Sequence, residues 1–114
     1  MATRYYLSLP DPDRARGNAP DLAFRAQGAE AFAQELQDAL RTDGLFQRWR
    51  DAQDDPEAVD PALGATDPAA VVQGTQDHKR VDLLATTCIS GAVLKHRLRL
   101  LAGSSWELRD VKAG

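Results

Sequence analysis

Residues 71–111, VVQGTQDHKRVDLLATTCISGAVLKHRLRLLAGSSWELRDV, decide the fold class of this chain. Two aliphatic stretches flank a polar cluster at residues 74–79, which has the composition of a turn between two strands. The stretch from Arg80 to Cys88 is rich in β-branched and aliphatic side chains, as is typical of a central strand. The pattern predicts a strand, a turn and a second strand.

A helix and a last strand are expected next. Ser90 can cap the helix, because its hydroxyl can accept a hydrogen bond from a backbone amide in the first turn. Apolar side chains then recur every three or four positions and form one stripe, which consists of Val93, Leu94, Leu98, Leu100 and Leu101. Gly103 supplies a stop signal, and the alternation from Trp106 to Val111 predicts a strand.

The first half of the chain supplies further elements. Residues 4–9 alternate apolar and polar side chains as a strand does. Residues 22–27 alternate too, which favours a strand, although they are also compatible with the start of a helix. The clearest helical pattern spans residues 29–41, and we expect Gly44 to take the left-handed conformation at its end. A short second helix, with Leu45, Phe46 and Trp49 as its apolar side chains, is expected up to about residue 52.

Residues 21–112 therefore read strand, helix, strand, strand, helix, strand. This order predicts an α+β fold of the ferredoxin-like, split βαβ type (βαββαβ), which is an antiparallel sheet with two helices on one face. Residues 4–9 would add an extra N-terminal strand. If residues 22–27 are helical instead, the strand at residues 4–9 takes the first position and the topology is unchanged. The fold alone assigns no function, since it hosts enzymes, ligand-binding modules and RNA-binding domains.

Length and composition predict one domain in a reducing compartment. A chain of 114 residues can bury a modest core without cross-links. The single cysteine, Cys88, excludes an intrachain disulfide and a cysteine-based zinc cluster. No apolar run reaches the ~20 residues that span a bilayer, and the first residues lack the layout of a secretory signal. We expect a cytoplasmic protein with no membrane association and no cofactor.

Charge is distributed unevenly along the chain. Residues 30–77 carry three basic and eleven acidic side chains, a net −8, whereas residues 78–114 carry seven basic and three acidic ones, a net +4. Within the acidic part, residues 53–68 combine aspartates with three prolines and few large apolar side chains. This composition predicts a flexible acidic linker.

The residues that carry chemistry form no catalytic signature, and we assign no catalytic residue. Cys88 precedes a helix N-terminus, where a thiol can be activated, but we expect a small buried core residue. His78 and His96 lie on different elements, so their positions predict no metal site. They are nevertheless the only proton-transfer candidates for an alternative hypothesis, a small enzyme with a cleft between sheet and helices.

The basic C-terminal third suggests a tentative anion-binding site. Its residues are Ser90, Gly91, Lys95, Arg97 and Arg99. Ser90 and Gly91 lie at the amide-rich end of the helix, and the three basic side chains would add mobile charge for a small anion or an acidic partner. Nucleic acid is disfavoured, because the central strands lack the stacking aromatic residues of an RNA-binding sheet.

Our leading hypothesis is a small interaction module that self-associates through its sheet as a homodimer. Two helices cover only one face of a sheet, so the other face must be polar or covered by a partner. On the strand from Arg80, the side chains expected on that second face mix charged and apolar groups, and they are Arg80, Asp82, Leu84 and Thr86.

Overall fold

The computed structural model describes residues 2–113 and contains one sheet and three α-helices. The strands are β1 (Thr3–Leu9), β2 (Val71–Asp77), β3 (Arg80–Thr87) and β4 (Glu107–Ala113). The helices are α1 (Ala29–Arg41), α2 (Gly44–Asp51) and α3 (Gly91–Ala102), and short 3₁₀ turns occur at Pro12–Arg14, Pro56–Ala58 and Pro61–Gly64. The predicted α+β class is confirmed.

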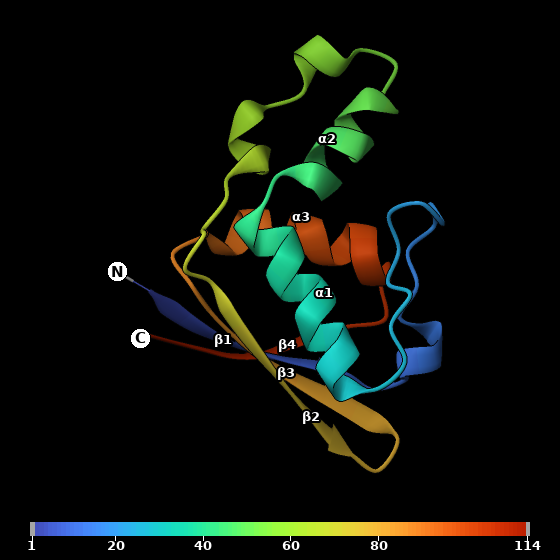
Figure 1. Ribbon diagram of the computed structural model, residues 1–114, viewed down its shortest axis with the longest axis vertical. Helices are drawn as coiled ribbons and strands as arrows, with labels where there is room; N and C mark the ends of the chain where they lie inside the picture. Colours follow the sequence, from blue (N-terminus) through green and yellow to red (C-terminus); the bar gives the residue numbers. More distant parts are fainter. Residues whose placement is uncertain (1, 114) are drawn as a thin grey trace.

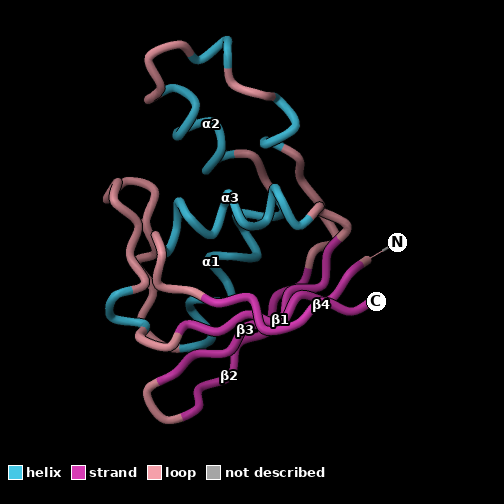
Figure 2. Tube along the Cα trace, turned by 180° about the vertical axis from the view of Figure 1, so that it is seen from behind, coloured by secondary structure: helices cyan, strands magenta, loops and turns pink. Residues whose placement is uncertain are grey.

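The four strands form an antiparallel sheet in the order β2-β3-β1-β4. Helices α1 and α3 lie on one face of this sheet, and the opposite face is open (Figures 1 and 2). Helix α2 and residues 53–64 lie beyond α1 and α3, on the side away from the sheet, and residues 65–70 run back to the start of β2 (Figure 1). The predicted turn shrinks to two residues, His78 and Lys79, because β2 extends to Asp77.

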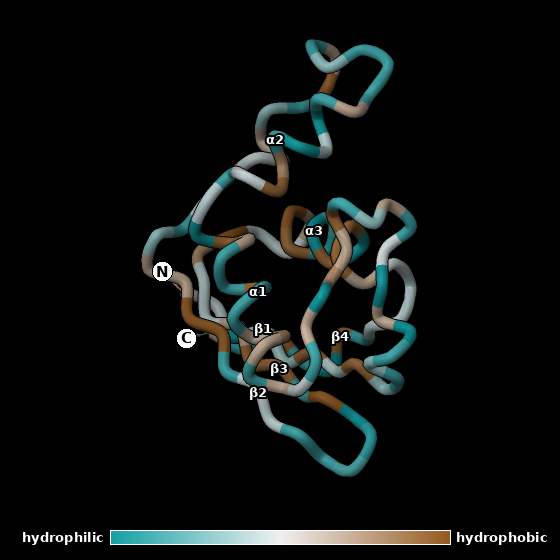
Figure 3. The backbone as a smooth tube through the Cα atoms, turned by 45° about the vertical axis from the view of Figure 1, so that its right-hand side comes forward, coloured by the Kyte–Doolittle hydropathy of each residue, from teal (hydrophilic) through white to brown (hydrophobic). Residues whose placement is uncertain are grey.

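The core lies between the sheet and the two covering helices. Every second residue of β3 is buried there, beginning with Val81 and ending with Thr87. Six leucines are buried in the same cluster: Leu36 and Leu40 of α1, Leu83 of β3, and Leu94, Leu98 and Leu101 of α3. Leu100, which the predicted stripe on α3 also included, is only partly buried. Hydrophobic stretches of α3 and of the sheet are visible as brown segments of the tube in Figure 3. Burial of such side chains is the main favourable contribution to folding.

The strand favoured for residues 22–27 is wrong, because the segment is neither strand nor helix. Residues 4–9, predicted as an extra N-terminal strand, instead form most of β1, the first of the four strands of the sheet. The alternation at residues 22–27 is real, because Leu22, Phe24 and Ala26 are buried. However, the Phe24 amide donates to the carbonyl of Leu101 at the end of α3 (2.8 Å). The Phe24 and Ala26 carbonyls accept from the Arg16 guanidinium (3.1 and 2.7 Å). The backbone therefore finds its partners without joining a sheet.

The helix boundaries follow the expected signals at α3 but not at α1. Ser90 is the N-cap of α3, and its hydroxyl accepts from the Val93 amide (3.4 Å). Gly103 ends the helix with a φ of 63°. The left-handed conformation expected for Gly44 is wrong, because this residue begins α2 and Thr42 ends α1 in an extended conformation.

A buried arginine joins three parts of the fold. Arg97 on α3 has only 1 % of its surface exposed. Its guanidinium donates to the Ala39 carbonyl near the end of α1 (2.8 Å) and to the carbonyls of Leu63 (3.2 Å) and Ala65 in the segment after α2. Ala39 is among the last four residues of α1, whose carbonyls have no partner within the helix. Arg97 therefore caps α1 and holds residues 63–65 against α3.

The acidic segment at residues 53–68 has further attachments. The Asp67 amide donates to the Leu40 carbonyl (2.8 Å), and the Arg50 guanidinium donates to the Pro56 carbonyl (3.0 Å). The flexibility expected for the whole segment stays a prediction, but these contacts divide it into a part that is bound to the helices and a part around Asp54 that is exposed.

Replacing Arg97 should destabilise the protein far more than replacing its neighbour Arg99, which is exposed on the same helix. Arg97→Ala leaves three carbonyls without their donor and opens a cavity, so we expect a loss of about 2–4 kcal/mol in the free energy of unfolding. Arg99→Ala should stay within about 0.5 kcal/mol of the parent chain. Urea titration followed by far-UV circular dichroism measures both, and equal effects would mean that the Arg97 bonds contribute nothing.

Hydrogen exchange should reveal the two parts of the acidic segment. The Asp67 amide is bonded and buried, so it should exchange through unfolding on a much slower timescale than the exposed amides at residues 54–55. Exchange monitored by NMR gives both rates. Uniformly fast exchange up to Asp67 would show that the contacts with α1 and α3 do not persist.

Candidate functional site

The residues proposed for an anion site lie in different environments. Ser90, Lys95 and Arg99 are exposed. Gly91 lies close to the Tyr5 ring. The expectation that Arg97 belongs to an exposed basic surface is wrong, because this residue is buried and its two terminal guanidinium nitrogens donate to backbone carbonyls, whereas its Nε has no partner in the described part of the chain. Burial lowers the pKa of Arg97, while the negative charge of Asp43 acts in the opposite direction. Periodicity gave a hint, since Arg97 lies between Leu94 and Leu101 on the buried stripe.

The two histidines lie in different environments. His78 occupies the β2–β3 turn with a φ of 55° and an almost fully exposed side chain. His96 packs edge-on against Trp49 of α2, with 4.4 Å between ring centroids. Burial lowers the pKa of His96, and the positive charges of Arg99 and Arg97 lower it further. Neither histidine lines any of the clefts described below.

Cys88 is exposed, so the expectation of a buried core thiol is wrong. It follows Thr87, the last residue of β3, and lies in the bend between β3 and α3. Beside it, the buried Asp67 carboxylate accepts from the Cys88 amide (3.0 Å), the Thr87 hydroxyl (2.8 Å) and the Ala69 amide (3.0 Å). These bonds, the one from the Cys88 amide first, lower the pKa of Asp67 from its ordinary value of 3.8. Asp67 thus fastens the end of the acidic segment to the end of β3.

The helices leave one face of the sheet uncovered, which we call the open face (Figure 2). Its centre is formed by Tyr6 of β1 and Leu84 of β3, which lie directly opposite each other and are half-buried. The Lys112 ammonium lies over the Tyr6 ring, 5.4 Å from its centroid. A shallow depression of about 460 Å³ beside this pair is lined by Gln73, Thr75, Arg80, Asp82 and Arg109 as well.

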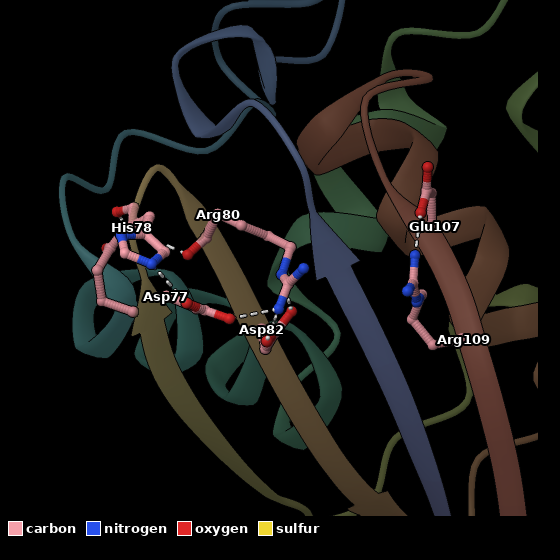
Figure 4. Close-up of polar contacts among 7 residues, drawn as sticks. Asp77, His78, Arg80, Asp82, Glu107 and Arg109 are labelled. Atoms are coloured by element: carbon pink, nitrogen blue, oxygen red, sulfur yellow. Dashed lines mark hydrogen bonds and ion pairs between the residues drawn. The ribbon is translucent and has the colours of Figure 1, made fainter.

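Charges on the open face form ion pairs within the chain (Figure 4). Arg80 lies between two carboxylates, at 2.6 Å from Asp77 and 3.0 Å from Asp82. Arg109 pairs with Glu107 at 2.8 Å. The hairpin end of this face therefore carries three carboxylates and two guanidinium groups. Exposed pairs of this kind contribute little to stability but set the pattern of charge.

The opposite end of the open face is basic. Arg4 of β1 and Lys112 of β4 are direct neighbours there, opposite Thr86 on β3. Lys112 lies 3.7 Å from Asp110, and both side chains are more than half exposed. The central pair of Tyr6 and Leu84 thus separates a basic end from an end with excess acid.

Both edges of the sheet are poorly suited to pairing with another strand. On β2, the Val72 amide donates to the Gln37 side chain of α1 (3.1 Å). On β4, the register shifts beside Tyr6 and Leu7, and most side chains are charged. Covered groups, bulges and charges are the usual means of protecting sheet edges. An interaction of this sheet is therefore expected at its face.

Within residues 2–113, no group of three or more His, Cys, Asp or Glu side chains is arranged to hold a metal ion. None of the helices in that part of the chain has the length and apolar character needed to cross a bilayer. The chain matches no protein family model, no characterised protein and no solved structure at a significant level.

The lowered pKa of Asp67 predicts a specific loss of stability in acid. A carboxyl whose pKa is lower in the folded state stabilises the fold above its unfolded pKa, and this contribution disappears as the pH falls through the folded pKa. At neutral pH, Asp67→Asn should cost about 1–3 kcal/mol, because a charged acceptor of three bonds is lost. The difference from the parent chain should shrink below about pH 4.

Asp54→Asn is the matched control, since Asp54 is exposed in the same segment. Urea unfolding midpoints of the parent chain and of both variants, measured from neutral to acidic pH, test this prediction. A constant difference between the Asp67 variant and the parent chain across this range would mean that the carboxylate charge is irrelevant to the attachment.

Proposed function

We propose that this protein is a small interaction module that binds a second copy of itself through the open face of its sheet. The observation that carries the proposal is the arrangement of this face, with a half-buried Tyr6–Leu84 pair between a basic end and an end with excess acid. A surface that pairs with itself must be self-complementary.

A twofold axis across the strands at the level of Tyr6 brings opposite charges together at the two ends of the face, while Asp110, which pairs with Tyr6, meets Asp110 of the second copy at the axis. Such an axis places β4 over β4 of the second copy, with the two strands running in opposite directions. Lys112 of one copy then faces the region of Glu107 in the other copy. Arg4 then lies over the hairpin end, near Asp82 of the second copy. The apolar pair lies at the centre, where desolvated side chains contribute most to binding. The charged ends fix the orientation of the two copies.

We also propose that the fold belongs to the ferredoxin-like, split βαβ type. The support is the strand order of the sheet. The chain contains two successive βαβ units, β1-α1-β2 and β3-α3-β4, and β3 of the second unit lies between β1 and β2 of the first. A cytoplasmic location remains part of the proposal, and the free thiol of Cys88 is compatible with a reducing compartment.

The alternative functions have less support. An enzyme using His78 or His96 lacks a cleft beside either imidazole among those described. Binding of an anion or an acidic partner at Lys95 and Arg99 stays a prediction. Nucleic-acid binding is weakened further, because Arg80 and Arg109 are already paired with carboxylates.

The oligomeric state tests the proposal. We expect a dimer at tens of micromolar by light scattering after size exclusion, and Leu84→Glu should convert it to a monomer because a charge is placed at the centre of the interface. Val111→Glu is the matched control, since Val111 is exposed (47 %) and lies on the helix side of the sheet, where it pairs with Tyr5. Circular dichroism verifies that both variants fold.

Charge reversal tests the orientation. Lys112→Glu and Glu107→Lys should each weaken the dimer, and the double variant should restore it, because the two positions would face each other in the twofold arrangement. A monomeric parent chain, or a dimer that Leu84→Glu leaves unchanged, overturns the proposed function.

A further inference from the structure

A cleft of about 600 Å³ lies in the helical layer, away from the open face of the sheet. It opens between residues 21–25, the second half of α1, the start of α2 and the end of α3. Its apolar floor consists of core residues, namely Leu22, Ala39, Leu45 and Leu101. Clefts that bind small molecules have volumes of about 300–1,000 Å³ and are mostly apolar, with a few polar groups.

The walls of this cleft are fixed by hydrogen bonds. The Phe24 amide donates to the Leu101 carbonyl (2.8 Å), which attaches one wall to α3. The Arg25 amide donates to the Glu35 carboxylate (3.0 Å), which attaches the same wall to α1. The cleft therefore exists before any ligand binds, and a preformed site lowers the cost of binding.

Five charged side chains surround the opening: Asp21, Arg25, Glu35, Asp38 and Arg48. Across residues 2–113, none of these five is part of an ion pair. The open face of the sheet differs, because Arg80 and Arg109 there are paired with carboxylates. The rim of the cleft thus offers carboxylates and guanidinium groups that can still accept a charged partner.

We propose that this cleft binds a small zwitterion with an apolar body, of the chemical class of an apolar α-amino acid or a short apolar peptide. The apolar body lies on the leucine floor, the ammonium group binds among the three carboxylates, and the carboxylate binds Arg25 or Arg48. A purely anionic ligand would meet three like charges, and a purely cationic ligand would meet two. Charge-assisted bonds of both kinds are available only to a molecule that carries both charges.

The experiment compares probes that differ only in charge. L-Leucine, L-phenylalanine and leucyl-leucine carry both charges, leucinamide carries only the positive one, and 4-methylpentanoate carries only the negative one. Titration followed by backbone NMR should show saturable shifts at residues 21–25 and 38–48 with at least one zwitterion. Leucinamide and 4-methylpentanoate should bind at least tenfold more weakly. No such shifts with any zwitterion at about 10 mM, or equal binding of the singly charged probes, overturns the proposal.

Variants of the rim test which side chains bind the carboxylate and the ammonium group of the ligand. At least one of Arg25→Gln and Arg48→Gln should weaken binding of the zwitterion tenfold or more and leave leucinamide unaffected, whereas Asp38→Asn should weaken both. Unchanged binding of the zwitterion in both arginine variants overturns the proposed carboxylate contact. Arg14→Gln is the control, because Arg14 is an exposed arginine outside the cleft. Repeating the titration with Leu84→Glu separates this site from the proposed self-association. Binding should persist in that variant, since the cleft and the open face share no lining residue.

Discussion

The structure depends on one buried cation, the guanidinium of Arg97. A charge taken out of water is costly unless several hydrogen bonds compensate it, and here the acceptors are backbone carbonyls from two separate segments. One acceptor, at Ala39, belongs to the negative end of α1, where the helix dipole favours a positive charge. The same side chain therefore ends α1, positions the segment after α2 and fixes α3 between them.

The two faces of the sheet use charge in opposite ways. On the helix side, Arg97 and Asp67 are buried and bind backbone groups, so each holds an irregular segment in place. On the open face, Arg80 and Arg109 remain accessible and bind carboxylates. The buried charges on the helix side hold the fold together, whereas the exposed charges on the open face determine which surface of another molecule can dock against it. Some charged residues of the sequence thus stabilise the fold, and others define the charge pattern of the surface.

Periodic patterns allowed most regular elements to be predicted from the sequence. The stripe on α3, the Ser90 cap and the Gly103 stop were all found, because each is a local signal. The alternation at residues 22–27 misled, since burial of every second side chain also occurs in an irregular segment that packs on a core. The position of Arg97 between Leu94 and Leu101 indicated that it is buried, but its role was missed because the sequence does not reveal which distant carbonyls a side chain bonds. Of the surfaces that carry the proposals, only the outward row of β3 was anticipated, and the cleft depends on four segments whose proximity no local pattern reveals.

Side chains that bind backbone groups explain how two long irregular segments can belong to one small domain. Residues 15–28 run along the end of α3 and are held by Arg16, and residues 53–70 run past α1 and are held by Arg97 and Asp67. Each anchor supplies the partners that a strand or helix would otherwise provide for its own backbone. Because the two segments are fastened at different ends of α1 and α3, the helical layer is not closed between them. The cleft lined by Leu22 and Leu45 lies between the first of these segments, the ends of α1 and α3 and the start of α2, so its shape depends on how Phe24 and Arg25 are attached to the two helices.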